Sequence, residues 1–217
     1  MKREACMLEL RYGMLDTLKN GIRDYKMAIE NRLEKIGAKN ASIWSVNGFA
    51  YVYAEFDDKS AYSLKDFISP FEYDLMYVSQ YVAKPGEMRL MYHDIGCVHK
   101  DKAEIRRRVF ATKLKPNCAE EYKARHQRLI DARENEGVDH AESNFTIWCA
   151  KDTYIFGYAE MVRAFDHEMT EEEKKSTIEW ETKQLEIMDW FTDDVDWITG
   201  EKHDKMEKLF VQKGYEG

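Results

Sequence analysis

The sequence repeats itself at about half its own length, and this repeat limits the fold more than any other feature. The pattern Asn40-x-x-Ile43-Trp44 recurs 104 residues later as Asn144-x-x-Ile147-Trp148. The pair Ala54-Glu55 recurs at a spacing of 105 as Ala159-Glu160, and the additional residue falls in a predicted turn. Because self-similarity at a fixed spacing indicates repeated structural units, we expect two copies of one unit in this 217-residue chain.

Both halves are predicted to contain the same order of elements. β-Branched and aromatic runs predict strands, and apolar residues at helical spacing predict helices. The expected strands are 3–10, 40–46, 49–56 and 88–98 in the first half, then 107–116, 143–150, 154–162 and 205–213 in the second. The expected helices are 15–36, 63–81, 119–136 and 170–194. Each half therefore has the order β-α-β-β-α-β.

Short local signals support this order. Asn47-Gly48 between two strand-like runs is a strong hairpin signal, and Lys151-Asp152 occupies the matching place in the second half. Pro70 is expected to kink or split the helix 63–81, because proline removes a helical hydrogen bond. Thr170 with Glu173 predicts a capping box at the start of the last helix.

The predicted fold class is α+β, with tandem ferredoxin-like repeats that form an intramolecular dimeric α/β barrel. The order β-α-β-β-α-β gives a four-stranded antiparallel sheet with both helices on one face and the other face bare. Two such sheets, in residues 1–100 and 101–217, can cover each other within one chain. We therefore expect no homodimer to be needed for the barrel, and further oligomerisation stays open.

Composition excludes several classes of partner. A net charge of −8 at pH 7 disfavours nucleic acid, whose phosphates require a basic surface. No apolar run approaches the roughly 18 residues of a membrane span, and the first ten residues lack the apolar stretch of a secretory signal. Cys6, Cys97, Cys118 and Cys149 lie far apart without a Cys-x-x-Cys pair, so neither disulfides nor a structural zinc site is expected. These observations predict a cytoplasmic protein without nucleic-acid or membrane partners.

The candidate catalytic residue is His126. It lies four residues after Tyr122 on one face of the predicted helix 119–136, on a stripe that continues through apolar positions. At the 104-residue spacing the first half has Leu18 and Ile22 instead. Since unpaired polar groups in a core cost about 1–3 kcal/mol, stability alone favours the aliphatic pair in both halves. The phenol and imidazole of the second half are therefore predicted to be functional.

At Glu121-Tyr122-x-x-x-His126, followed by Asn144-Phe145-x-Ile147, the second half resembles the L-rhamnose mutarotase family. The resemblance covers nearly all of residues 107–213. It implies that His126 is the proton donor and that Tyr122 and Phe145 contact the sugar. A Trp-Trp pair of the family is replaced here by Ile187-Met188, and Trp190 is the nearest indole.

The resemblance implies an isomerase that interconverts the α and β anomers of a free monosaccharide, L-rhamnose or a related pyranose. No metal, nucleotide or redox cofactor is expected. Phe145, Trp148 and Trp190 are the predicted stacking residues for the apolar face of the sugar. Glu160 is a candidate general base, although Glu55 matches it in the first half and a structural role is open.

Two other functions stay open at this level. A non-catalytic module that binds a sugar or a partner protein fits the loss of polar residues in the first half. A cofactor-free or haem-dependent monooxygenase fits the predicted barrel by analogy of fold alone.

Overall fold

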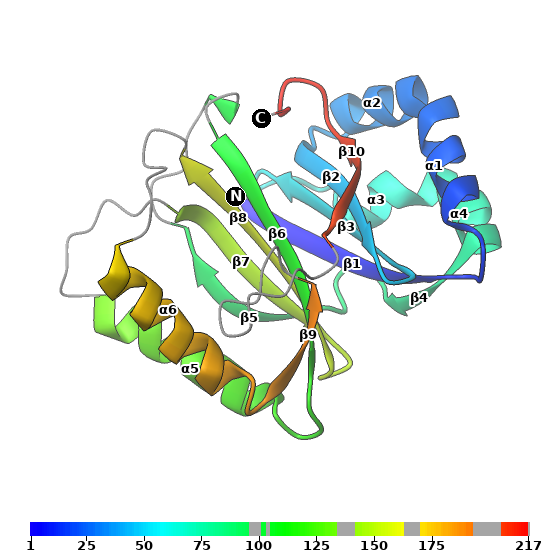
Figure 1. Ribbon diagram of the computed structural model, residues 1–217. Helices are drawn as coiled ribbons and strands as arrows, with labels where there is room; N and C mark the ends of the chain where they lie inside the picture. Colours follow the sequence, from blue (N-terminus) through cyan, green and yellow to red (C-terminus); the bar gives the residue numbers. More distant parts are fainter. Residues whose placement is uncertain (96–100, 103–104, 134–141, 163–169, 193–204, 217) are drawn as a thin grey trace. The chain divides into compact units, whose positions relative to one another are not determined.

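The computed structural model describes residues 1–95, 101–102, 105–133, 142–162, 170–192 and 205–216 (Figure 1). Within these ranges the strands form two five-stranded sheets in which all neighbouring strands are antiparallel. The chain divides into two compact units. Unit 1 contains residues 1–88 and 207–216, and unit 2 contains residues 89–206.

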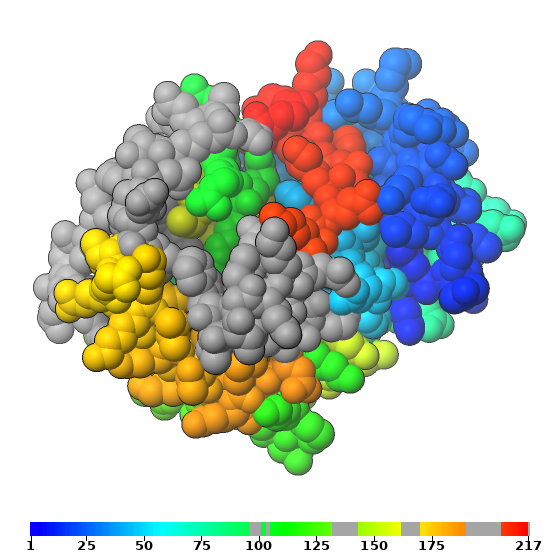
Figure 2. Space-filling model, viewed as in Figure 1, coloured from blue at the N-terminus to red at the C-terminus, as the bar shows by residue number. Residues whose placement is uncertain are grey.

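Unit 1 holds a sheet with the strand order β10-β2-β3-β1-β4. Its elements are β1 (Lys2–Leu10), α1 (Leu15–Asp24), α2 (Lys26–Lys35), β2 (Lys39–Val46), β3 (Phe49–Phe56), α3 (Leu64–Ile68), the 3-10 helix η1 (Ser69–Phe71), α4 (Glu72–Val78), β4 (Ser79–Ala83) and β10 (Glu207–Val211). Figure 2 shows the C-terminal segment in red against the blue N-terminal helices, and Lys19 pairs with Glu207 at 2.8 Å.

Unit 2 holds a sheet with the strand order β5-β7-β8-β6-β9. Its elements are β5 (Arg89–Asp94), β6 (Ile105–Leu114), α5 (Ala119–Arg133), β7 (Glu142–Ala150), β8 (Tyr154–Val162), α6 (Glu171–Gln184) and β9 (Met188–Thr192). Figure 1 shows α5 and α6 side by side on one face of this sheet. Apolar residues of β5, β6, β7 and β8 pack beneath α5 in a single core.

The central hairpins of the two sheets have matching geometry. Asn47 and Gly48 have φ values of 50° and 78°, and Lys151 and Asp152 have 52° and 51°, as the predicted tight turns require. Ahead of each hairpin, Asn40 and Asn144 have φ values of 50° and 51° where the register shifts. The positive φ values and the register shifts occur at corresponding positions of both sheets, as expected for two copies of one unit.

The last predicted strand of each half lies in the other unit, which corrects the sequence prediction. Residues 89–94 form β5, which pairs with β7 in unit 2, and β10 pairs with β2 in unit 1. The segments β4 and β9, which the sequence assigned to helix ends, pair with β1 and β6. At Ser79 the chain leaves the helix with φ −149° and ψ 179°, and the Ser79 hydroxyl donates to the Leu75 carbonyl at 2.7 Å. The residues of β4 therefore pair with β1 instead of continuing the helix.

The predicted helices differ in length from those of the structure. The helix 15–36 is two helices, α1 and α2, that meet at Tyr25. The helix 63–81 is split around Pro70 as expected, into α3, η1 and α4. The capping box at Thr170 and Glu173 is confirmed, but α6 ends at Gln184. None of the helices within the ranges given above is long and apolar enough to cross a membrane.

Candidate functional site

Tyr122 and His126 lie together on the buried face of α5. Tyr122 is 2% exposed and His126 is 7% exposed, although both are polar. Their rings are 4.2 Å apart between centroids and tilted by 34°, as expected for neighbours one helical turn apart. The prediction that these two residues share the core-facing stripe of one helix is confirmed.

Aromatic rings from two further elements contact the imidazole of His126. Tyr92 of β5 meets it edge-on at 5.5 Å, and Trp180 of α6 meets it edge-on at 5.4 Å. Behind Tyr92, the cluster continues through Phe145 at 5.0 Å to Phe110, which lies 6.2 Å from Phe145. The side chain of His126 therefore faces aromatic rings, and no charged group among the described residues pairs with it.

A glycine makes room for this cluster. Phe110 and Gly157 are directly opposite each other on β6 and β8. A Cβ atom added at Gly157 would lie 2.2 Å from the Phe110 ring, closer than real contacts allow. In the sheet of unit 1 the corresponding pair is Cys6 and Val52, where the large and small residues are reversed. The ring cluster around Phe110 is thus a feature of unit 2.

Burial and one hydrogen bond determine the protonation of His126. Burial lowers the pKa of His126 from 6.5 to about 4, and the hydrogen bond to Tyr122 acts weakly in the opposite direction. The imidazole is therefore neutral at neutral pH. Its Nδ1 lies 2.9 Å from the carbonyl oxygen of Tyr122. Because a carbonyl only accepts, Nδ1 carries the hydrogen and Nε2 has the free lone pair.

The phenol of Tyr122 is held in its neutral form. Burial raises the pKa of Tyr122 well above its ordinary value of 10, and the positive charge of Arg108 opposes this effect only in part. The guanidinium of Arg108 lies 5.3 Å from the centroid of the Phe110 ring, on the helix-facing side of the sheet. At neutral pH, Tyr122 can therefore donate or accept a hydrogen bond without carrying charge.

Two residues of α6 were missed by the sequence analysis. Trp180 contacts His126, and Gln184 lies one turn further on the same face of α6. Gln184 is 2% exposed, and neither its amide nitrogen nor its amide oxygen has a hydrogen-bond partner in the described structure. Arg125 of α5 bonds to the Lys183 carbonyl, which places this end of α6 beside the Tyr122 turn of α5.

Tyr92 was also missed, because it lies outside the segment that resembles the mutarotase family. Trp180 is the one tryptophan of α6, whose other residues are mostly charged or polar. The sequence therefore gave little indication that it contacts His126.

Of the predicted stacking residues, Phe145 joins the cluster and Trp148 does not. Trp148 is three residues further along β7, and side chains alternate between faces along a strand, so it lies on the opposite face of the sheet. There its ring stacks on Phe156 at 5.8 Å. Trp190 lies in β9 rather than in a helix, and its side chain is outside the described part of the structure.

Glu160 lies on the face opposite the histidine, because it is three residues from Gly157 along β8. Its carboxylate is fully buried and accepts from Lys102 at 2.6 Å, Tyr158 at 3.0 Å and Asn144 at 3.1 Å. This arrangement favours a structural role for Glu160 over the role of general base.

Unit 1 repeats the same arrangement without a histidine. Glu55 accepts from Tyr53 at 2.6 Å and from Asn40 at 2.7 Å. A network present in both units is explained by the demands of the fold, since buried carboxylates require hydrogen bonds. Among the described residues, no group of three or more His, Cys, Asp and Glu side chains could hold a metal ion.

Comparisons with known proteins agree with the fold and with the second-half motif. No curated protein matches the chain. Among solved structures, a Fusobacterium nucleatum protein described as a "Putative monooxygenase" aligns with a TM-score of 0.51 at 10% sequence identity. The alignment covers 97% of this chain and 93% of that chain. At this identity it shows the fold alone, and it confirms the predicted α+β class of the dimeric α/β barrel.

A model of the L-rhamnose mutarotase family matches residues 107–212. This segment contains Tyr122, His126, Phe145 and Trp180 of the ring cluster, and Tyr92 precedes it. The second half of this chain therefore carries the sequence pattern of the L-rhamnose mutarotase family.

Proposed function

We propose that the second half of the chain is an aldose mutarotase, an isomerase that interconverts the α and β anomers of L-rhamnose or a related free pyranose. One observation carries the proposal. The histidine of the family pattern, His126, is neutral, has a fixed tautomer and faces aromatic rings rather than charges. Such a site suits a neutral, polyhydroxylated ligand with apolar ring faces. The family match over residues 107–212 supports the substrate class.

The neutral state of His126 sets the order of the proton transfers. Nε2 first accepts the proton of the anomeric hydroxyl. The bond between the anomeric carbon and the ring oxygen then breaks, the carbonyl of the open sugar forms, and Nε2–H returns the proton to the ring oxygen. Both oxygens are attached to the same carbon, so one nitrogen can serve both. After rotation of the aldehyde, the reverse steps close the ring to the other anomer.

The resemblance implies that His126 is the proton donor. In this scheme His126 donates a proton only after it has accepted one from the anomeric hydroxyl. The intermediate imidazolium is stabilised by the Tyr122 carbonyl, whose hydrogen bond to Nδ1 favours the charged form. Acid–base assistance of this kind is worth about 10²–10⁴-fold in rate. The proton is returned within each turnover, so the scheme requires no cofactor and no second titrating residue.

The neighbouring groups can hold the sugar. The rings of Tyr92, Trp180 and Phe145 offer flat apolar surfaces against which a pyranose can stack. Gln184 offers an amide donor and an amide acceptor that lack partners in the described structure, and sugar hydroxyls can satisfy both. An unsatisfied buried polar group costs about 1–3 kcal/mol, so a ligand that pairs with this amide gains affinity.

The test is anomer exchange followed by NMR. Saturation transfer between the α and β anomeric protons is measured for a panel of 6-deoxy and ordinary hexoses, with and without the protein. We expect accelerated exchange for at least one sugar, and its loss in His126→Ala. The matched control is Ile22→Ala, which truncates the corresponding residue of the first half. A folded Ile22→Ala variant should retain exchange.

Two outcomes would contradict the proposal. Exchange at the wild-type rate in a folded His126→Ala variant would remove the catalytic assignment. Binding of a sugar without accelerated exchange would favour the non-catalytic module instead. Circular dichroism of each variant establishes that it is folded before either result is interpreted.

A further inference from the structure

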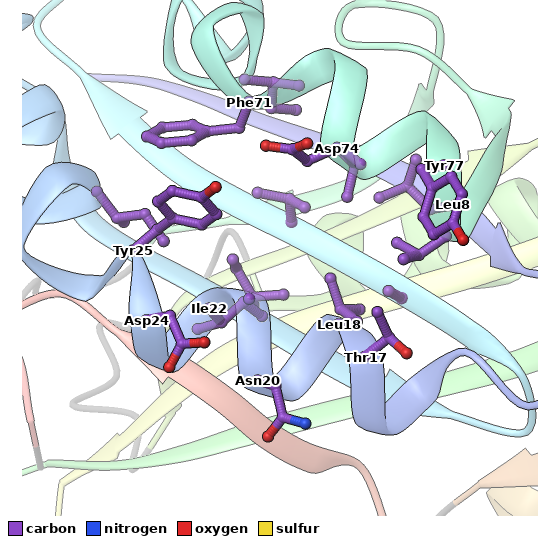
Figure 3. A pocket seen from close by; sticks show the side chains of 18 of the residues that line it. Leu8, Thr17, Leu18, Asn20, Ile22, Asp24, Tyr25, Phe71, Asp74 and Tyr77 are labelled. Carbon is purple, nitrogen blue, oxygen red and sulfur yellow. The ribbon is translucent and has the colours of Figure 1, made fainter.

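Unit 1 contains a cavity of about 360 Å³ where unit 2 holds part of its ring cluster (Figure 3). Leu18 and Ile22 of α1 line this cavity, and they occupy the positions of Tyr122 and His126 at the 104-residue spacing. Figure 3 shows Leu18 and Ile22 pointing from α1 into the cavity. Small-molecule sites range from roughly 300 to 1,000 Å³, so this cavity is large enough for a small ligand.

The floor of the cavity consists of aliphatic side chains from the sheet. Leu8, Ile43, Ala50 and Val52 of the sheet form it, and none of the lysines, arginines or histidines in the described ranges lines the cavity. Val52 occupies the position of Gly157 in the other sheet. An apolar floor leaves sugar hydroxyls without partners, which is costly, whereas it favours an alkyl or aryl group. The body of the ligand should therefore be apolar.

One end of the cavity has a different chemistry. Tyr25, Phe71 and Asp74 gather there, as Figure 3 shows, and the first two rings are 6.3 Å apart at an angle of 52°. The carboxylate of Asp74 makes no hydrogen bond or ion pair with the described residues. The second carboxylate at the mouth, Asp24, pairs with its neighbour Arg23 at 3.4 Å. Ring faces and a carboxylate both attract cations and repel anions.

We propose that this cavity binds an organic cation with an apolar body, such as an alkyl- or arylammonium ion. The apolar body lies on the floor formed by the sheet, and the ammonium group lies at the end formed by Tyr25, Phe71 and Asp74. The site is separate from the sugar site and does not depend on the proposed mutarotase function. It gives a binding role to a half of the chain that lacks the histidine.

Gly21 supports this assignment and supplies the test. It lines the cavity within α1, where glycine is less favourable than alanine. A Cβ added at Gly21 would meet nothing within 4 Å, so no packing constraint requires glycine there. The missing side chain leaves room at the cavity wall. A larger side chain at this position can enter the cavity without displacing the core.

The experiment is titration calorimetry of the full chain with three probes of equal chain length: decyltrimethylammonium, decanol and decanoate. We expect decyltrimethylammonium to bind roughly three- to tenfold more tightly than decanol, because ring and carboxylate attraction adds to apolar burial. Decanoate should bind most weakly. Gly21→Phe should fill the cavity and lose at least about tenfold in affinity, since the apolar floor is then occupied. Ala28→Phe adds the same ring at an exposed position of α2 outside the cavity and should bind as wild type does.

A second variant keeps the proposal testable if Gly21→Phe fails to fold. Asp74 is exposed, so Asp74→Lys should fold normally and should reverse the preference between the ammonium and the carboxylate probes. Unchanged binding in a folded Gly21→Phe variant would place the ligand elsewhere and overturn the proposal. Equal affinity for decanoate and decyltrimethylammonium, or no binding of any probe, would overturn it as well.

Discussion

The buried imidazole of His126 should make the stability of the protein depend on pH in a predictable way. In the unfolded chain a histidine accepts its proton near pH 6.5, whereas folded His126 accepts one only near its lowered pKa of about 4. Between these values the unfolded state binds more protons, so acidification favours unfolding. At 1.36 kcal/mol per unit of pKa, the lowering corresponds to about 3 kcal/mol. This penalty is absent above pH 6.5 and complete below pH 4.

Urea unfolding at several pH values between 7.5 and 4 measures this penalty. His126→Gln is the reference, because its amide can still donate to the Tyr122 carbonyl but does not titrate. Subtracting the variant from the wild type cancels the contributions of the other histidines. Relative to the variant, the wild type should lose about 3 kcal/mol of unfolding free energy by pH 4.

A difference curve for His126→Gln that stays flat across this pH range would refute the reasoning. It would mean that the imidazole is as well solvated in the folded protein as in the unfolded chain. The neutral state on which the proton path is built would then be wrong.

Three further predictions follow from the same geometry. The catalysed exchange rate, corrected for the uncatalysed rate, should stay constant from pH 8 to 5 and fall near pH 4, where His126 becomes charged; a rise on acidification would mean that the imidazolium is the reactive form. Gly157→Ala should destabilise the protein by about 1–3 kcal/mol in urea unfolding because its Cβ overlaps a ring, whereas Gly21→Ala should stabilise it by up to ~1 kcal/mol; equal effects would contradict this contrast. Trp180→Leu should raise the sugar KM by about two- to tenfold through lost stacking, and Trp148→Leu on the opposite sheet face should leave KM unchanged; the reverse pattern would exchange the two assignments.

Local signals in the sequence were sufficient for the hairpins and for the central pair of the site. The turns at Asn47-Gly48 and Lys151-Asp152 follow from residues that tolerate positive φ. The pair Tyr122 and His126 stood out because the corresponding helix positions in the first half are aliphatic. The hairpin prediction depends only on residues that are adjacent in the chain. The site prediction depends on one comparison between the two halves.

What the sequence did not predict depends on contacts between distant segments. The five-residue strands β4 and β9 continue helical patterns and become strands only by pairing with β1 and β6. No local pattern specifies that β5 joins the sheet of the second half. The role of Trp180 depends on where α6 lies against α5, and a charged helix sequence carries little information about that.

The exchange of edge strands has a consequence for how such a chain can change through inheritance. Substitutions that erase the chemistry of the first half leave the second site intact, as Leu18 and Ile22 illustrate. Deletion of the first half is a different event, because it removes β5 and with it the ring of Tyr92 beside His126. It also exposes the backbone of β7 as an unpaired edge. Selection for the second site is therefore enough to retain the segment of the first half that forms β5.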